Sequence, residues 1–220
     1  MSEAFTLVIG TRRFSSWSLR PYLALKAAGA SFAEVEIALR QPDTKERILA
    51  WSPSGKVPLL LHGGVKVWDS LAICEYLAEL FPAAGLWPEA AEARAVARAA
   101  AAEMHSGFPA LRNACPMDLV EPVSLAEISP EVAQDAARIR AVWADCRARF
   151  GVGGPFLFGR FGVADAMYAP VVTRFKTYHV KLDAVCAGYG ERIMALPAMQ
   201  EWIASAQEEP DDLEELEVEF

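Results

Sequence analysis

The sequence lacks the paired cysteines and clustered histidines that mark disulfide frameworks and zinc sites. Its 220 residues include only three histidines and four cysteines, and no two cysteines have the C-x-x-C spacing. The cysteines are scattered along the chain at Cys74, Cys115, Cys146 and Cys186. This distribution favours reduced thiols and argues against a bound metal.

Three further absences narrow the function. The N-terminus, M-S-E-A-F-T-L-V-I-G, has no basic segment followed by a long apolar run, and no apolar stretch approaches the roughly 18 residues that a membrane-spanning helix needs. We therefore expect a cytoplasmic protein that does not insert into membranes. The glycines form neither G-x-G-x-x-G nor G-K-[ST], and no serine stands in G-x-S-x-G. No nucleotide site and no serine hydrolase are predicted.

Basic charge is also missing from the end of the chain. Residues 207–220 contain eight acidic residues and no Lys or Arg, so they account for the whole net charge of -8. The rest of the chain is neutral and has no basic footprint for nucleic acid. We expect residues 207–220 to form a solvated, disordered acidic tail.

At 53% hydrophobic and 23% charged residues, the chain is typical of a soluble globular protein of two subdomains. The first half alternates strand and helix patterns, and no strand pattern follows Trp68. Strands are predicted at 4–9, 32–39, 57–61 and 65–68, and helices at 16–28, 44–51 and 71–81. After a linker, further helices are predicted at 89–112, 130–150, 164–176, 183–196 and 198–206.

A serine-rich turn joins the first strand to the first helix. Ser15, Ser16 and Ser18 precede Arg20 and Pro21 in the stretch S-S-W-S-L-R-P. Backbone N–H groups at a helix start are unpaired and the dipole is positive there, so a serine hydroxyl in this turn could stabilise a sulfur anion. The alternative is that Ser15 and Ser16 only cap the helix.

Two more motifs surround the predicted hairpin. Pro58 interrupts a strand pattern, which places it at an edge or a turn, where an X-Pro bond can adopt the cis form. A cis bond here would direct the backbone groups of Val57 out of the sheet, toward an extended peptide. Asp69 and Ser70 open the next helix. They either cap it or bind the carboxylate and ammonium of an amino-acid head group.

In order, the motifs are S-S-W-S-L-R at 15–20, G-K-V-P at 55–58, D-S at 69–70 and F-G-V-A-D at 161–165. Over residues 5–206 the chain resembles a cytosolic glutathione transferase of serine type. The turn is similar to the S-S-C-S-x-R motif of bacterial zeta-class enzymes, with Trp17 in place of the cysteine of that motif. The resemblance implies an α/β thioredoxin-like N-terminal domain (β-α-β-α-β-β-α, residues 1–82), a linker (83–88) and an all-α C-terminal domain (89–206).

The resemblance also assigns roles. Ser15 would hydrogen-bond the glutathione sulfur as the catalytic residue. The backbone of Val57 would pair with the cysteinyl part of glutathione, beside a cis Pro58, and Lys56 would reach the tripeptide. Ser70 would take the γ-glutamyl carboxylate and Asp69 would lie near its ammonium.

Three residues of the second half are candidates for a functional or a structural role. Asp165 is expected to be a structural N-cap residue, although Gly162 stands where the family has Ser or Thr. Together with Trp17, His105 and Arg112 are candidates for the second-substrate pocket, where Arg112 would meet an anionic co-substrate. The alternatives are a core position for His105 and a solvated face for Arg112.

The resemblance implies conjugation of glutathione, as co-substrate and without a bound cofactor, to a small electrophile, in a homodimer that serves detoxification. A glutathione-dependent isomerase or dehalogenase is the first alternative, although Trp17 argues against the zeta-type isomerase substrate. A non-catalytic binding protein of the same fold is the second. A disulfide reductase is disfavoured because the turn has no cysteine.

Overall fold

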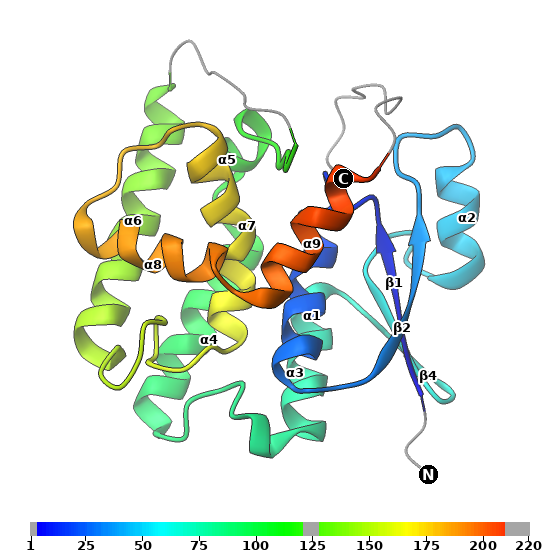
Figure 1. Cartoon of the computed structure of the whole chain (residues 1–220), viewed down its shortest axis with the longest axis horizontal. Helices are drawn as coiled ribbons and strands as arrows, with labels where there is room; N and C mark the ends of the chain where they lie inside the picture. Colours follow the sequence, from blue (N-terminus) through cyan, green and yellow to red (C-terminus); the bar gives the residue numbers. More distant parts are fainter. Residues whose placement is uncertain (1–3, 121–127, 210–220) are drawn as a thin grey trace.

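The computed structural model describes residues 4–120 and 128–209. Its N-terminal half contains the predicted order of strands and helices, namely β1 (Phe5–Gly10), α1 (Ser16–Ala27), β2 (Phe32–Ile37), α2 (Thr44–Trp51), β3 (Leu59–His62), β4 (Val65–Trp68) and α3 (Ser70–Leu80). The sheet order is β2-β1-β3-β4, with β1 parallel to β2 and antiparallel to β3. In Figure 1, α1 and α3 lie on the side of the sheet that faces the helical half, and α2 lies on the other side.

The C-terminal half contains helices, as predicted. They are a 3₁₀ turn η1 (Pro82–Ala84), α4 (Ala91–Ser106), α5 (Pro109–Ala114), α6 (Pro130–Phe150), α7 (Val163–Thr177), α8 (Ala184–Met194) and α9 (Pro197–Gln207). The predicted α/β thioredoxin-like domain followed by an all-α domain is therefore confirmed. None of the helices among the described residues combines the length and apolarity needed to cross a membrane.

The predicted helix over residues 89–112 is wrong at Gly107. Helix α4 ends at Ser106, and a new helix begins at Pro109. A proline disfavours the right-handed helical conformation for the residue before it, and Phe108 has a φ of 59°. A Cβ on Gly107 would lie 2.5 Å from the carbonyl oxygen of Glu103. Helix α4 therefore ends here, and the chain leaves the helical conformation before α5 begins.

Two of the strands, β2 and β3, are shorter than the sequence predicted. The strand predicted over 32–39 ends at Ile37, and the one predicted over 57–61 begins at Leu59. Pro58 has no N–H group to donate to a ladder, so pairing can begin only after it.

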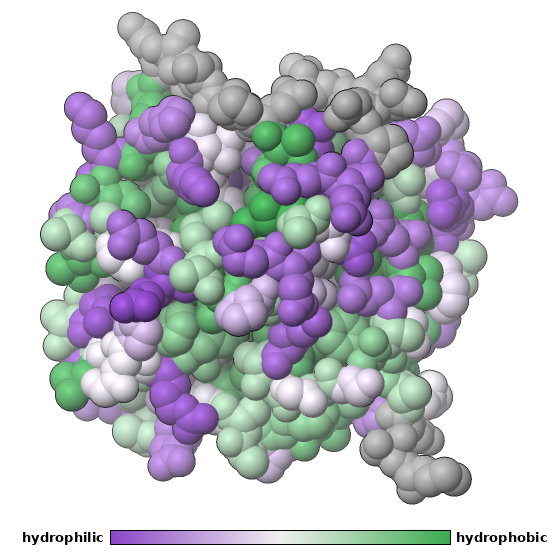
Figure 2. All heavy atoms as spheres, viewed as in Figure 1, coloured by the Kyte–Doolittle hydropathy of each residue, from purple (hydrophilic) through white to green (hydrophobic). Residues whose placement is uncertain are grey.

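The two halves share one hydrophobic core. A single cluster of buried side chains joins Leu7 of β1, Leu23 of α1 and Ile73 of α3 to Met104 of α4 and Trp143 of α6. On the face shown in Figure 2, hydrophilic and hydrophobic side chains are interspersed outside this core. The shared core fixes the sheet edge relative to the helical half.

The C-terminal segment holds the turn between β1 and α1. The indole Nε1 of Trp202 in α9 donates to the carbonyl oxygen of Arg12 at 3.0 Å. The carboxylate of Glu209 accepts the backbone N–H groups of Arg12 and of Arg13, the latter at 2.9 Å. Burial raises the pKa of Glu209, against the opposing effect of these N–H donors.

The prediction of a solvated tail is thus wrong at its start. Gln207 belongs to α9 and Glu209 is partly buried. The remainder of the predicted tail, residues 210–220, lies outside the described residues.

Asp165 forms the hydrogen bond predicted for it at the start of α7. Its Oδ2 accepts the N–H of Gly162 at 2.9 Å, and its Oδ1 accepts the N–H of Leu157 at 3.1 Å. Burial raises the pKa of Asp165 to about 7, and these two N–H donors oppose that rise. The carboxyl group joins the preceding loop to the helix N-terminus.

The linker explains why Gly162 stands where the family has Ser or Thr. The carbonyl oxygen of Leu86 accepts the N–H of Val163 at 2.9 Å, and a Cβ on Gly162 would lie 2.5 Å from that oxygen. A side chain here would force the linker away from α7. The capping serine of the family does not fit this packing.

We therefore expect Gly162→Ser to lower the free energy of unfolding by roughly 1–3 kcal/mol, although it restores the capping motif. Thermal denaturation measures the change. The control is Gly188→Ser in α8, where an added Cβ meets nothing within 4 Å. A serine there should leave stability unchanged or slightly raised. A Gly162→Ser variant as stable as the wild type would refute the packing argument.

Candidate active site

Three of the sequence motifs meet at one edge of the sheet. Leu59, the first residue of β3, pairs with Val8 of β1 on one side and with Trp68 of β4 on the other. Because β3 is antiparallel to both neighbours, β1 and β4 end at the edge where β3 begins. The turn after Gly10, the Val57-Pro58 peptide and Asp69-Ser70 are therefore neighbours.

Ser15 stands at the N-cap position of α1 but does not cap the helix. Its side chain makes no cap hydrogen bond, and it is only 6% exposed. The hydroxyl donates instead to Oγ of Ser18 at 2.7 Å, and Ser18 Oγ accepts the N–H of Gly10 at 3.1 Å. The interpretation of Ser15 as a simple cap is thus wrong.

Ser18 was named with the serines of the turn, but the sequence analysis did not predict that it would accept the Ser15 hydroxyl. Its spacing of three from Ser15, on the same face of a helix, was the available signal. Ser16 points elsewhere, since its Oγ lies 3.4 Å from Nη2 of Arg174 in α7 and accepts a hydrogen bond from it. Ser15 thus belongs to the sheet edge and Ser16 to the contact with the helical half.

The Val57-Pro58 peptide bond is cis, as the motif suggested. Val57 is partly buried, whereas Lys56 is exposed. The backbone N–H of Lys56 donates to Oγ of Ser54 at 3.2 Å.

Ser70 is buried, at 2% exposure, and its Oγ has no hydrogen-bond partner among the described residues. A buried hydroxyl without a partner costs free energy. The site therefore holds a hydroxyl suited to a ligand oxygen.

Asp69 caps α3, as one of its two interpretations required. Its Oδ1 accepts the N–H groups of Leu71 at 2.9 Å and Ala72 at 3.4 Å. Its backbone φ of 76° is costly for a residue other than glycine, which is typical of functional positions. Its Oδ2 lies 3.1 Å from Nε2 of His105, and the side chain remains 44% exposed. The exposed carboxylate of Asp69 can therefore cap α3 and also face a ligand ammonium.

Two opposing effects act on the Asp69 carboxyl. Burial raises the pKa of Asp69, but the hydrogen bond and charge of His105 and the N–H donors of Leu71 and Ala72 together lower it more. The net pKa lies below the ordinary value, so the carboxylate is ionised near neutral pH.

The three candidates for a second-substrate pocket lie together. The rings of Trp17 and His105 meet edge to face, with centroids 5.3 Å apart. The guanidinium of Arg112 is 5.6 Å from the Trp17 ring centre, and Nη1 of Arg112 donates to the carbonyl oxygen of His105 at 3.4 Å. The guanidinium of Arg20 is 3.8 Å from the Trp17 ring centre. We call Trp17, His105 and Arg112 the aromatic–cationic cluster.

Cysteine chemistry is unfavourable in this chain. All four cysteines are free and buried. Burial raises the pKa of Cys74 and Cys186 to about 12 and that of Cys115 and Cys146 to about 11. None of them supplies a thiolate near neutral pH, so any reactive sulfur must come with a substrate.

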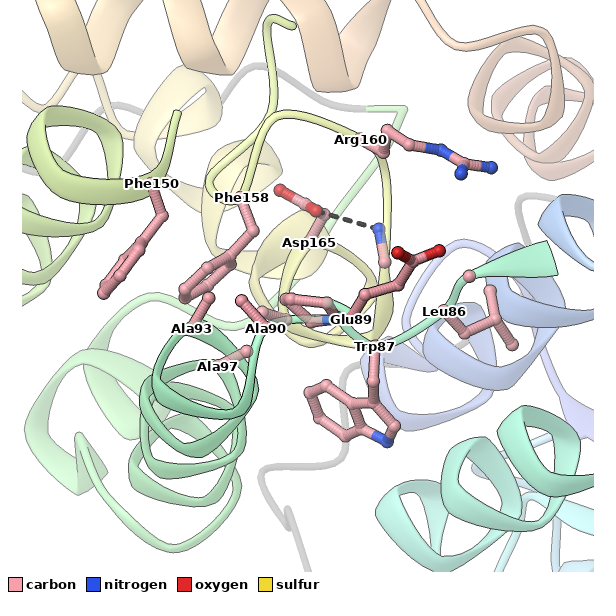
Figure 3. A pocket seen from close by; sticks show the side chains of 14 residues that line it. Leu86, Trp87, Glu89, Ala90, Ala93, Ala97, Phe150, Phe158, Arg160 and Asp165 are labelled. Atoms are coloured by element: carbon pink, nitrogen blue, oxygen red, sulfur yellow. Dashed lines mark hydrogen bonds between the residues drawn. The ribbon is translucent and has the colours of Figure 1, made fainter. Parts of the chain in front are cut away.

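A cavity of about 460 Å³ lies away from this site, beside the linker (Figure 3). Phe150, Phe158 and the alanines of α4 face it, and Asp165 lies at its inner end with its oxygens already hydrogen-bonded. Among the described residues, none of the unpartnered buried polar atoms belongs to its lining. Unlike the sheet edge, the described lining of the cavity therefore offers no buried polar atom that lacks a partner.

A thioredoxin-like domain joined to a helical domain, with buried hydroxyls at the edge of its sheet, defines the class of the protein. Residues 14–80 match the model of the glutathione S-transferase N-terminal domain, and residues 129–205 match that of the C-terminal domain. The chain belongs to the cytosolic glutathione transferase family.

Relatives agree with this assignment. The chain is 34% identical over 106 residues to glutathione S-transferase 1 of Dianthus caryophyllus, which covers 48% of each protein. It is 35% identical over 102 residues to a probable maleylacetoacetate isomerase of Caenorhabditis elegans, covering 46% of this chain and 47% of the relative. These matches span about half the length of the two relatives. Glutathione S-transferase Z2 of Arabidopsis thaliana is 25% identical over 206 residues, with 90% and 89% covered.

Solved structures share the whole fold. A glutathione transferase homolog from Burkholderia with bound glutathione superposes with a TM-score of 0.70 at 24% identity, covering 94% of this chain and 99% of the other. The Tau class glutathione S-transferase of Mangifera indica also gives 0.70, at 20% identity, covering 93% and 96%.

Proposed function

We propose that the protein is a serine-type glutathione transferase that joins the glutathione thiolate to a small electrophile. The observation that supports this most is a pair of buried hydroxyls at one sheet edge. Ser15 caps nothing although it stands at a helix start, and Ser70 has no partner among the described residues. The Ser70 hydroxyl is therefore available to a ligand, and the Ser15 hydroxyl becomes available when a ligand atom replaces Ser18 as its acceptor.

The proposed chemistry is activation of a thiol. A glutathione thiol has a pKa near that of free cysteine, about 8.5, so only a few per cent is ionised at neutral pH. One hydroxyl donor and the α1 N-terminus would need to lower that pKa by roughly one to two units, which is about 1.4–2.7 kcal/mol. The sulfur would replace Ser18 as the acceptor of the Ser15 hydroxyl.

The rest of glutathione would lie along the edge. The Val57 backbone would pair with the cysteinyl part, beside Pro58, and Lys56 would approach the tripeptide from solvent. Ser70 would bind the γ-glutamyl carboxylate, and Asp69 its ammonium. No bound cofactor is needed.

The electrophile would lie against the aromatic–cationic cluster. Trp17 offers a flat apolar surface, and Arg112 stands beside it without a carboxylate partner among the described residues. This arrangement favours an electrophile with an anionic group. The thiolate would attack its electrophilic carbon.

The second candidate is a glutathione-dependent isomerase or dehalogenase. The zeta-like turn and the relatives named maleylacetoacetate isomerase favour it. Assays with aryl halides, epoxides, peroxides and unsaturated acids separate the two, because conjugation consumes one glutathione per product whereas isomerisation returns it. Binding of glutathione without any turnover would support a non-catalytic protein instead.

We also propose a cytoplasmic homodimer, on the family resemblance. Sedimentation at micromolar concentration should give about twice the chain mass of 24.0 kDa. A species of single chain mass would contradict it.

A further inference from the structure

The Asp69 carboxylate is held from both halves of the molecule. Oδ1 receives the two N–H groups at the start of α3, and Oδ2 receives Nε2 of His105, which stands in the last turn of α4. A carboxylate has about four acceptor positions. Two-sided anchoring therefore fixes its direction and still leaves lone pairs on Oδ2 for an incoming cation.

The His105 ring is itself held in place. The edge-to-face contact with Trp17 limits its rotation, and Arg112 binds its carbonyl oxygen. The break at Gly107 and Phe108 brings α5, and with it Arg112, back to this point. Trp17 of α1 thus contacts the imidazole itself, and Arg112 of α5 holds the backbone that carries it.

The hydrogen-bond pattern assigns the proton of His105. Nε2 faces an acceptor, so it donates, whereas Nδ1 is buried and has no partner among the described residues. The Nε2–H donor therefore orients the Asp69 carboxylate through one hydrogen bond.

We propose that His105 is a positioning residue of the glutathione site, which aims the Asp69 carboxylate at the ammonium of the γ-glutamyl group. This inference rests on the proposed function. It places His105 in the recognition of glutathione, whereas the sequence suggested either the second-substrate pocket or a core position. The low pKa of Asp69 is consistent with the contact.

The test compares two ligands by calorimetry: glutathione, and an analogue in which a glutaryl group replaces γ-glutamyl so that the ammonium is absent. Wild-type protein should bind glutathione about tenfold more tightly than the analogue, the size of one charge-assisted contact. Asp69→Asn should remove most of this ratio. His105→Leu should reduce it nearly as much, while affinity for the analogue changes less than about twofold.

Two variants serve as controls. His105→Gln places an amide donor near the former Nε2 and should keep most of the ratio. His62→Leu makes the same change at a ring bonded to the Tyr76 hydroxyl in the sheet, and should leave the ratio intact.

The outcomes are distinct. If Asp69→Asn removes the ratio and His105→Leu does not, the role of His105 is refuted while the proposed function stands. If the wild-type protein binds neither ligand, the proposed function fails, and this inference with it.

Discussion

Replacing Ser15 with alanine is expected to reduce turnover roughly ten- to fiftyfold at about pH 6.5, and by less than about twofold at about pH 9. Without the hydroxyl donor, the pKa of bound glutathione should rise by one to two units toward its solution value. At the higher pH the thiolate forms unaided, so the difference closes. Steady-state rates across this pH range, with glutathione saturating, measure the effect.

Ser16→Ala is the control for this substitution. Ser16 lies beside Ser15 but faces Arg174, so its loss should leave the pH profile unchanged. If Ser16→Ala moves the profile and Ser15→Ala does not, Ser16 is the catalytic hydroxyl. If neither moves it, no serine of the turn activates the thiol.

Replacing Ser70 with alanine should weaken glutathione binding by about 10- to 150-fold. A hydrogen bond to a charged carboxylate contributes about 1.5–3 kcal/mol. The γ-glutamyl carboxylate is remote from the sulfur, so ground state and transition state should lose equally, and turnover of the bound complex should change little. Calorimetry and saturation kinetics separate the two quantities.

Ser129 provides the matched comparison. Its hydroxyl accepts the N–H of Val132 and caps α6, far from the sheet edge in sequence. Ser129→Ala should cost about 1 kcal/mol of stability and leave the affinity for glutathione intact. Equal affinities of Ser70→Ala and wild-type protein would rule out the proposed γ-glutamyl site.

Features set by neighbouring residues could be predicted from the sequence. The Ser15 turn, the cis bond before Pro58 and the cap at Asp69 each depend on a few consecutive residues, and each motif has a local physical cause. Their meeting at one edge followed from the strand order, since β3 runs antiparallel to β1 and β4. The sequence patterns therefore predicted the fold class and the separate motifs, and the strand order in the structure brings the motifs together.

Features that depend on distant packing could not be predicted. The contact of Asp69 with His105 joins the two halves, and no periodicity in either segment indicates it. From the sequence alone, Glu209 is predicted to belong to a solvated acidic tail. Its carboxylate instead accepts the backbone N–H groups of Arg12 and Arg13, which are distant in sequence. The break after Ser106 was different, because the G-F-P sequence contained the signal and the alanine-rich pattern concealed it.

The most direct test of the account is a spectroscopic pH titration of glutathione bound to the wild-type protein, following the thiolate absorbance at the ultraviolet edge. The account predicts a midpoint roughly one to two units below that of the free thiol, about 8.5. A bound thiol that titrates at the same pH as free glutathione would contradict it.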